Sequence, residues 1–378
     1  MLIFIDENIP QGREAFSAYG EVRTFHGREL KQADLKQADA LLIRSITKVN
    51  AGLLDGTPVR FVGTATIGVD HVDQEHLRNA GIGFAAAPGC NARSVAEYFT
   101  AALLHLRVHR GLSLEGKTVG IIGYGNVGKQ IARVAPQLGL KVLLCDPPLQ
   151  QAGESGTFLS MKDLIAQSDI LTTHVPLTKT GAHATLKMLN REALERFAGP
   201  KVFMNTSRGE VADGDALLWA LANNKLSHLV LDVFPGEPHI DPKLADSADL
   251  ISPHIAGYSI QGKLNGTAQI LDAFLDHFKL EKKSAVKMPV PPQPVIAWPR
   301  GVDCETGMHH CVKHCYDILH DDIGLRRSLN DPELAKHFDH LRKTYPVRHQ
   351  FAGFSVTGIP REENMARHRL RGLGFTVE

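Results

Sequence analysis

The sequence lacks two features that would mark a membrane protein or a polyanion-binding protein. It has no long hydrophobic run, since no apolar stretch approaches the roughly 20 residues that span a bilayer. It also has little net charge, because 42 Lys and Arg nearly balance 41 Asp and Glu. Bulk electrostatics therefore give no reason to expect binding to nucleic acid or to an anionic membrane. These absences favour an ordinary globular protein.

Cysteine is scarce as well, with five residues in 378. An odd number in a chain of this size indicates free thiols in a reducing compartment rather than a disulfide framework. The first residues, MLIFIDENIP, pass from a short apolar run straight into acids, without the basic and apolar regions of a secretory signal peptide. We therefore expect a cytoplasmic protein of two or three domains.

Short apolar runs alternate with helix-like stretches over about the first 90 residues. The predicted strands are LIFID (2–6), ALLIRS (40–45), RFVGTAT (60–66) and GIGFAAA (81–87), and the predicted helices are PQGREAFSAYG (10–20) and VDQEHLRNAG (72–81). This rhythm predicts a parallel sheet covered by helices. Ser45 and Thr66 follow two of the strands, at the sheet edge where such folds bind ligands. Turn chemistry or helix capping explains the two residues equally well.

A second series of alternating strands and helices begins near residue 117. Before it, Ser94 and Glu97 have the spacing of a capping box that opens a long helix. Six strands are predicted, at TVGIIG (118–123), KVLLCD (141–146), ILTTHV (170–175), KVFMNT (201–206), HLVLDV (228–233) and LISPH (250–254). The pattern predicts a doubly wound sheet.

The remaining third of the chain changes in character. Residues 259–280 predict a helix that returns to the first lobe. Residues 282–299 hold five prolines and predict a linker. Beyond 300 we expect a small α+β unit, with helices at CVKHCYDILH (311–320) and DPELAKHFDHLRK (331–343) and strands at FAGFSVTG (351–358) and GFTVE (374–378).

The segment GYGNVG (123–128) has the glycine spacing of a dinucleotide-binding turn. Gly123, Gly125 and Gly128 follow an apolar strand and open an apolar-faced helix, whose N-terminus offers free N–H groups to a pyrophosphate. The next predicted strand ends in Asp146, about 20 residues on, where an acid accepts hydrogen bonds from a ribose 2′-hydroxyl. No arginine follows at once to bind a 2′-phosphate. The sequence therefore predicts NAD rather than NADP.

Three further polar residues follow predicted strands of the same sheet. Arg208 lies in NTSRGE (205–210), Glu237 in FPGEP (234–238) and His254 in SPHIAG (252–257). A guanidinium holds a carboxylate in a bidentate fork, and an imidazole, with a pKa near 6.5, exchanges a proton at neutral pH. A carboxylate bonded to that imidazole fixes its tautomer. Each of these residues alone could be an ordinary surface side chain. The three together predict a catalytic centre.

Cysteine and histidine gather early in the tail, at Cys304, His309, His310, Cys311, His314 and Cys315. Their spacing lacks the paired C-x2–4-C arrangement of structural zinc sites. The stretch also has an amphipathic helical pattern, with Val312, Cys315 and Leu319 on one face. We therefore expect buried thiols in a dimer-forming helix, and no metal.

The segments GIIGYGNVG, HVPLTKT (174–180), NTSRGEVAD (205–213), LDVFPGEP (231–238) and SPHIAG resemble the successive motifs of the D-isomer-specific 2-hydroxyacid dehydrogenases. The resemblance covers about residues 1–286. It implies a flavodoxin-like substrate-binding lobe (1–93 and 257–286) and an inserted Rossmann-type NAD lobe (94–256). A further C-terminal domain (287–378) follows the region that this resemblance covers. The fold class is therefore α/β, with two doubly wound parallel-sheet lobes and a small α+β domain.

The resemblance also implies roles for individual residues. Arg208 would bind and polarise the substrate, His254 would be the acid/base, and Glu237 would be its partner. The cofactor would contact Asn126, Val127, Asp146, Val175, Thr206, Asp232 and Gly257, besides the three glycines. Ser45, Thr66 and Tyr258 would contact the substrate.

A narrower resemblance is carried by FIDENIP (4–10), GTATIGVDHVD (63–73), AAAPGCNARSVAEYF (85–99) and the tail. It is to family members that oxidise a phosphorylated 2-hydroxy acid and form homodimers through a C-terminal domain. A phosphate needs cations, and Arg44 is the obvious one beside Ser45. We therefore expect a tail arginine, Arg342 or Arg348, to reach an active site in its own or the partner subunit.

Two alternatives remain open at this stage. D-3-phosphoglycerate dehydrogenases also act on a phosphorylated 2-hydroxy acid, although their regulatory tail is differently patterned. NAD-sensing corepressors use the same fold and keep the catalytic residue types, so the sequence separates them poorly from enzymes.

Overall fold

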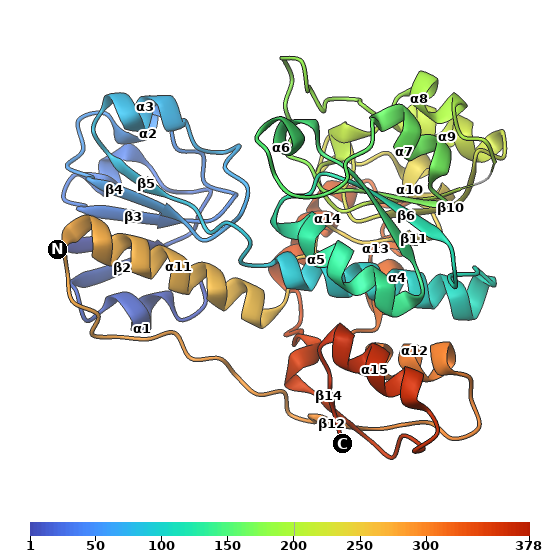
Figure 1. Ribbon diagram of the computed structural model, residues 1–378. Helices are drawn as coiled ribbons and strands as arrows, with labels where there is room; N and C mark the ends of the chain where they lie inside the picture. Colours follow the sequence, from blue (N-terminus) through green and yellow to red (C-terminus); the bar gives the residue numbers. More distant parts are fainter. Residues whose placement is uncertain (200) are drawn as a thin grey trace. The chain divides into compact units, whose positions relative to one another are not determined.

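The computed structural model describes residues 1–199 and 201–378. It divides the chain into two compact units (Figure 1). Unit 1 comprises Met1–Asn91 and Ser259–Pro289, and unit 2 comprises Ala92–Tyr258 and Val290–Glu378. Unit 1 has one parallel sheet and unit 2 has two, and each unit has its own apolar core. Among the described residues, no helix is long and apolar enough to cross a membrane.

The sheet of unit 1 has five parallel strands in the order β2-β1-β3-β4-β5, which is the flavodoxin-like order. The strands are β1 (Leu2–Asp6), β2 (Glu21–Phe25), β3 (Ala40–Ile43), β4 (Phe61–Thr64) and β5 (Gly83–Ala85). Four of them match the predicted apolar runs. The fifth, β2, was not predicted, because it is an edge strand with a polar, largely exposed sequence.

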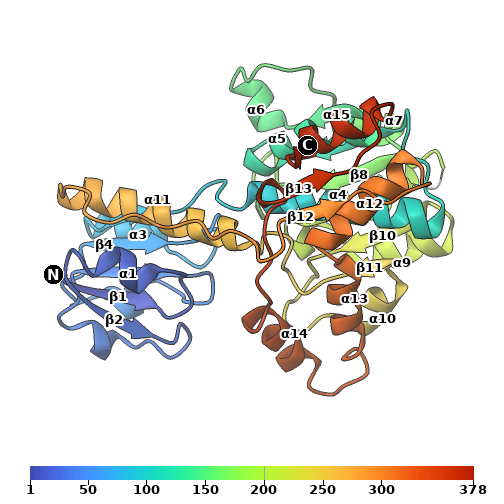
Figure 2. The same ribbon diagram turned by 90° about the horizontal axis from the view of Figure 1, so that it is seen from below.

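Helices cover both faces of this sheet. They are α1 (Gly12–Phe16), α2 (Ala51–Leu54), α3 (Gln74–Asn79), α11 (Ile260–Phe278) and the 3₁₀ turn η1 (Gln32–Leu35). Helix α11 is the predicted returning helix and packs against β4 (Figures 1 and 2). Its Phe274 ring meets the rings of Phe16 and Phe61 edge-on, with centroids 5.2 and 5.9 Å away. Burial of these aromatic rings joins the returning segment to the N-terminal residues.

The main sheet of unit 2 has six parallel strands in the order β11-β10-β9-β8-β6-β7. They are β6 (Thr118–Ile122), β7 (Lys141–Cys145), β8 (Ile170–Thr173), β9 (Lys201–Asn205), β10 (Leu226–Leu231) and β11 (Leu250–Ile251). All six predicted strands are present. The strand order reverses at β6, which lies between β7 and β8, so the carboxyl ends there open into the crevice typical of doubly wound folds.

The helices around this sheet include α4, α5 and a set of short segments. They are α4 (Ala92–Arg110), α5 (Asn126–Val134), η2 (Ala135–Leu138), α6 (Pro147–Gln151), α7 (Met161–Gln167), α8 (Arg191–Glu195), η3 (Gly209–Val211), α9 (Gly214–Ala222) and α10 (Pro242–Ser247). The predicted capping box at Ser94 and Glu97 was wrong, because α4 begins at Ala92 and both residues are buried within it. Glu97 instead accepts the backbone N–H of Phe351 from the tail.

The tail adds a three-stranded parallel sheet, β12-β13-β14, and four helices to unit 2. The elements are β12 (Val295–Ala297), α12 (Cys304–Cys315), α13 (Ile318–Arg326), α14 (Leu334–Lys343), η4 (Phe351–Gly353), β13 (Ser355–Thr357), α15 (Asn364–Leu373) and β14 (Thr376–Val377). The Pro-rich linker ends in the edge strand β12. The helix predicted at 311–320 is broken, since Asp317 caps a new helix by accepting the N–H of Leu319.

The tail packs on α4 rather than standing apart. Met308 and Cys311 of α12 share one apolar cluster with Tyr98 and Leu104 of α4. Gly307 lies so close to the Trp298 ring that a Cβ there would be 2.2 Å from it. Helix α4 is therefore buried between the six-stranded sheet of unit 2 and the tail.

Candidate active site

The turn after β6 has the form of a phosphate-binding cradle. Gly123 adopts φ 92°, and a Cβ there would lie 2.5 Å from the carbonyl oxygen of His174. A Cβ on Gly128 would lie 2.0 Å from the carbonyl oxygen of Gly123. Both glycines are thus required for the backbone path. Gly125 is different: it is the N-cap of α5, and a Cβ there would meet no protein atom within 4 Å.

The open space at Gly125 and the first N–H groups of α5 fit a pyrophosphate, because the helix N-terminus carries partial positive charge. Asp146 follows β7 directly and accepts the N–H of Tyr124 at 2.8 Å and that of Leu149 at 3.0 Å. Its carboxylate thereby joins the glycine turn to α6. Each oxygen retains lone-pair capacity for a ribose hydroxyl. The residues present fit NAD.

Replacing Gly125 with alanine is expected to weaken NAD binding while leaving the fold intact. Its φ of −72° and ψ of −156° suit alanine, so the new methyl group would occupy only the space open to the cofactor. We expect the Kd for NADH, measured by fluorescence titration, to rise about tenfold or more, which corresponds to roughly 1.4 kcal/mol. The contrasting variant is Gly128→Ala, whose methyl group would overlap backbone and lower stability by roughly 1–3 kcal/mol. Unchanged NADH affinity in Gly125→Ala would rule out a pyrophosphate at this turn.

The other cofactor candidates also lie at carboxyl ends of this sheet. Asn126 and Val127 form the first turn of α5, Val175 follows β8, Thr206 follows β9, Asp232 follows β10, and Gly257 lies in the loop after β11. Sequence reasoning gave no role to His174, which links two of these loops. Its ring nitrogens lie 2.9 Å from Thr172 Oγ1 and 3.4 Å from Thr206 Oγ1. Burial lowers the pKa of His174 to about 3, so its ring is neutral.

Arg208 is presented by a tightly held turn after β9. The side-chain oxygen of Asn205 accepts hydrogen bonds from Thr173 and from Ser207, while its amide donates to the Arg208 carbonyl at 2.9 Å. Gly209 packs against the backbone of Phe234, where a Cβ would overlap the carbonyl carbon at 1.9 Å. The Arg208 guanidinium donates to the Ser207 carbonyl at 2.8 Å. Sequence reasoning missed Asn205, although an Asn directly before a turn is a signal of such a clamp.

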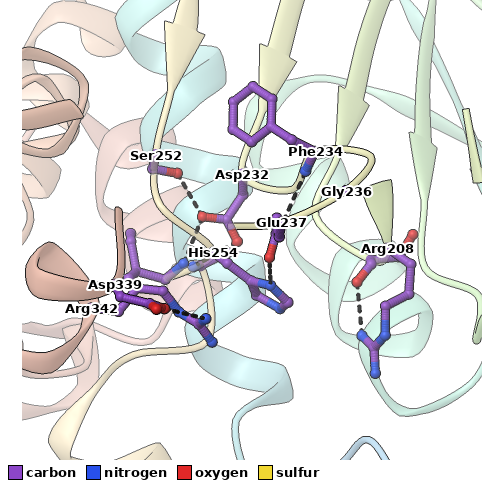
Figure 3. Close-up of polar contacts among 12 residues, drawn as sticks. Arg208, Asp232, Phe234, Gly236, Glu237, Ser252, His254, Asp339 and Arg342 are labelled. Atoms are coloured by element: carbon purple, nitrogen blue, oxygen red, sulfur yellow. Dashed lines mark hydrogen bonds and ion pairs between the residues drawn. The ribbon is translucent and has the colours of Figure 1, made fainter. Parts of the chain in front are cut away.

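His254 and Glu237 form a direct pair. His254 Nδ1 lies 2.7 Å from Glu237 Oε2, and Glu237 Oε1 accepts the N–H of Phe234 at 2.8 Å (Figure 3). Burial acts to raise the pKa of Glu237, but His254 and the Phe234 N–H hold it below its usual value. The carboxylate is therefore ionised and accepts Nδ1–H. This leaves Nε2 of the imidazole to take a proton.

Asp232 holds the loop that carries His254 in place through hydrogen bonds. Asp232 is buried and accepts hydrogen bonds from Ser252 Oγ at 2.6 Å and from the N–H groups of Ile255 and Ala256. His254 itself adopts φ 56°, an uncommon conformation for a residue with a side chain. Its N–H donates to the carbonyl oxygen of Asp232 at 2.7 Å. The network that orients the imidazole was not predicted, and it extends to α4, since the Tyr98 hydroxyl lies 2.8 Å from Ser252 Oγ.

The two tail arginines have different surroundings. Arg342, on α14, has a side chain 19% exposed and lies near Glu237 and Tyr258 of the same chain. Burial acts to lower the pKa of Arg342, but Tyr258 and Glu237 raise it, so the guanidinium is charged. In the view of Figure 3, Arg208 and Arg342 lie on opposite sides of His254. Arg348 is buried instead, and it donates to the carbonyl oxygen of Ala256 at 2.7 Å.

The predicted substrate contacts fall in both units. In unit 1, Ser45 follows β3 and is exposed, and Thr66 follows the adjacent strand β4. Thr66 Oγ1 lies 2.8 Å from Thr64 Oγ1. Tyr258 belongs to unit 2, and its ring meets that of Tyr345 edge-on with centroids 5.6 Å apart.

The cysteine and histidine residues of the tail do not converge as a group. The chain's five cysteines, all described, are free thiols. Cys311 is buried in the core, and burial raises its pKa to about 12. Cys304 donates to the sulfur of Met308 at 3.8 Å, and Cys315 donates to the Cys311 carbonyl at 3.3 Å. His309 faces α4 instead, where it meets His105 and His109.

Comparison with known proteins agrees with this geometry. Residues 96–256 match the family described as D-isomer specific 2-hydroxyacid dehydrogenase, NAD binding domain, and residues 288–374 match a domain of unknown function (DUF3410). The chain is similar to a D-lactate dehydrogenase from Aquifex aeolicus, solved with NAD and lactic acid. That structure is 26% identical, with a TM-score of 0.62 over 74% of this chain and 96% of the other.

Two curated relatives match over the full length. Erythronate-4-phosphate dehydrogenase of Salmonella arizonae is 41% identical over 100% of this chain and 98% of its own. The enzyme of the same name from Marinobacter nauticus is 42% identical over 100% of both chains. The sequence-based expectation of an NAD-dependent 2-hydroxyacid dehydrogenase is confirmed. The chain belongs to the D-isomer-specific 2-hydroxyacid dehydrogenases, and among them to the erythronate-4-phosphate dehydrogenases.

Proposed function

We propose that this chain oxidises the C2 hydroxyl of 4-phospho-D-erythronate to (R)-3-hydroxy-2-oxo-4-phosphobutanoate, with NAD as the oxidant, in the biosynthesis of pyridoxal 5′-phosphate (vitamin B6). The observation that carries the chemistry is the 2.7 Å contact between His254 Nδ1 and Glu237, next to an NAD-type sheet. The substrate's identity rests on the full-length similarity to relatives of that name.

The roles follow from what each side chain can donate or accept. The Arg208 guanidinium would hold the substrate carboxylate and polarise the oxygen at C2. Because Glu237 accepts Nδ1–H, Nε2 of His254 would take the C2 hydroxyl proton. NAD, when bound, supplies the acceptor for the C2 hydride. Loss of one proton and one hydride converts the alcohol to the ketone.

The remaining contacts position the reactants. The pyrophosphate would lie over Gly123, Gly125 and Gly128, with Asp146 on the adenosine ribose. Asn126, Val127, Val175, Thr206, Asp232 and Gly257 would line the rest of the cofactor site. Ser45, Thr66 and Tyr258 would contact the substrate. Asp232 also fixes the His254 loop, as its three accepted hydrogen bonds indicate.

Arg342 would supply positive charge to the substrate's phosphate from within the same chain. Supporting this, its Nε is buried without a hydrogen-bond partner in the described part of the chain, and it lies near Glu237 and Tyr258. Arg348 is instead engaged with the backbone under the His254 loop.

Replacing Arg342 with glutamine is expected to raise the KM for 4-phospho-D-erythronate about tenfold or more, because a hydrogen bond to a charged group contributes roughly 1.5–3 kcal/mol. The KM for unphosphorylated D-erythronate should change little. A matched control is Lys336→Gln, which removes an exposed charge from the same helix. Steady-state kinetics on both substrates makes the comparison. An equal rise in KM for the two acids would assign Arg342 to something other than the phosphate.

NADH formation against a panel of acids tests the function itself. The panel comprises 4-phospho-D-erythronate, D-3-phosphoglycerate, D-erythronate and D-lactate. We expect the highest kcat/KM for the first. A preference for D-3-phosphoglycerate would reassign the substrate while leaving the chemistry in place, whereas no turnover of any acid would favour an NAD-sensing binding protein.

We also propose a cytoplasmic homodimer formed through the C-terminal domain. Eight large apolar side chains are exposed among the described residues, and five of them lie between residues 290 and 378: Val290, Val295, Ile323, Val347 and Met365. A second copy that covered these side chains would remove their apolar surface from water. Light scattering of the full chain should give twice the monomer mass of 41.3 kDa.

A further inference from the structure

Three histidines meet within unit 2, at the contact between α4 and α12. His105 and His109 lie one turn apart on α4, and His309 faces them from α12. The ring centroids are 4.6 Å apart for His105 and His109, 5.1 Å for His109 and His309, and 6.2 Å for His105 and His309. The proposed reaction uses none of the three. Figure 2 shows the two helices side by side.

The ligand atoms are close enough to share an ion. One ring nitrogen from each histidine lies within 4.8 Å of those of the other two. A tetrahedral Zn²⁺ with bonds of about 2.0–2.1 Å holds its ligand nitrogens roughly 3.4 Å apart. Small side-chain rotations would close the difference. Two histidines at i and i+4 also present their rings on one helix face.

The three histidines differ in burial. His105 is buried, His309 is partly buried and His109 is exposed. A neutral imidazole carries a lone pair that can coordinate a metal ion. The cluster therefore reaches the surface on the side of His109.

A small cavity of about 10 Å³ lies beside two of the three histidines. Its lining includes His105, His309, Lys313, Tyr316 and Asp317, but not His109. That volume holds about one water molecule. The Asp317 carboxylate offers negative charge on one wall, although Lys313 lies 3.6 Å from it. A cavity this small excludes an organic substrate.

We propose that His105, His109 and His309 bind a divalent transition-metal ion of the Zn²⁺ class, with water as a further ligand, and that the ion links the C-terminal segment to α4. Imidazole is a preferred ligand of Zn²⁺, Ni²⁺ and Cu²⁺. An ion that holds α4 would also restrain the active site, because Tyr98 on α4 contacts Ser252 next to the His254 loop. We expected no metal from the sequence because only the cysteines and histidines near His309 were weighed. His105 and His109 on α4 were not among them.

Calorimetric titration of the full-length, EDTA-stripped protein with Zn²⁺ tests the proposal. We expect one tight site per chain in the wild type. His109→Gln and His309→Gln should each weaken it by more than the ~10–100-fold typical of losing an outer partner of a ligand. The matched control is His310→Gln, which alters the exposed neighbour of His309 on α12. His109 is also exposed, so its replacement should not unfold the protein.

Thermal melting gives a second readout that does not depend on catalysis. Saturating Zn²⁺ should raise the Tm of the wild type and of His310→Gln by roughly 3 °C or more, because a ligand that binds only the folded state stabilises it. The Tm of His109→Gln and His309→Gln should not rise. The proposal is overturned if the wild type binds no stoichiometric Zn²⁺, or if His310→Gln loses binding as much as the other two variants.

Discussion

The His254→Ala variant is expected to lose about 10²–10⁴-fold in kcat, the range that general acid–base catalysis contributes. The 2.7 Å contact to Glu237 leaves Nε2 of His254 as the free acceptor for the substrate proton. The pKa of Glu237 is held below its usual value, so this carboxylate remains ionised at neutral and mildly acidic pH. Alanine removes the acceptor and leaves that buried carboxylate without its imidazole.

The measurement is NADH formation at saturating NAD and 4-phospho-D-erythronate, together with the Kd for NADH. Because the glycine turn is unchanged, the Kd should stay within about threefold of the wild-type value. His239→Ala is the matched control, since His239 is an exposed histidine close to Glu237 in the same loop. It should retain full activity. A His254→Ala variant with wild-type kcat would exclude His254 as the proton acceptor.

The Glu237→Gln variant separates two roles of Glu237, which are to orient the His254 imidazole and to supply negative charge beside it. An amide of the same shape still accepts Nδ1–H through its oxygen, but it carries no charge to stabilise the protonated imidazole. We expect a smaller loss in kcat than for His254→Ala. An equal loss would mean that the charge of Glu237 matters as much as the imidazole itself.

Local pattern was sufficient to predict most strands and the cofactor turn. Five of the six strands in the main sheet of unit 2 are mostly buried apolar runs, and such runs stand out in a sequence. The sixth, the edge strand β7, is partly buried but equally apolar at Val142–Cys145. The glycines at 123 and 128 are required by close backbone contacts within a few residues of themselves or across one neighbouring strand. The exposed edge strand β2 was missed for the opposite reason, because nothing in its polar sequence distinguishes it from a loop.

Contacts between residues that are far apart in the sequence could not be predicted from local pattern. Glu97 has the spacing of a capping box, yet its carboxylate is used by Phe351, 254 positions away. The cluster of His105, His109 and His309 depends on the packing of α12 against α4. The only local signal was the H-x3-H spacing of HLRVH (105–109), which puts two imidazoles on one helix face. Arg342 was named as a candidate from charge alone, and the packing of α14 is what brings it near Glu237.

The second large effect is expected at Arg208. Lysine keeps the positive charge but loses the planar fork that binds a carboxylate through two parallel hydrogen bonds. The turn that presents Arg208 is fixed by Asn205 and by the contact of Gly209 with Phe234, so the backbone should not shift to bring a shorter donor to the substrate. We expect Arg208→Lys to lower kcat/KM by about 10²–10³-fold, comparable with removing one donor to a developing oxyanion.

The split between kcat and KM then tells what Arg208 does. If it only holds the carboxylate, KM rises and kcat is unchanged, because binding is lost equally from ground and transition states. If it also polarises the C2 oxygen, kcat falls too, and that is the result we expect. Arg196→Lys provides the control, since Arg196 forms an exposed ion pair with Glu192. Wild-type kcat/KM in Arg208→Lys would show that a single charge suffices at this position and would remove the bidentate role from the mechanism.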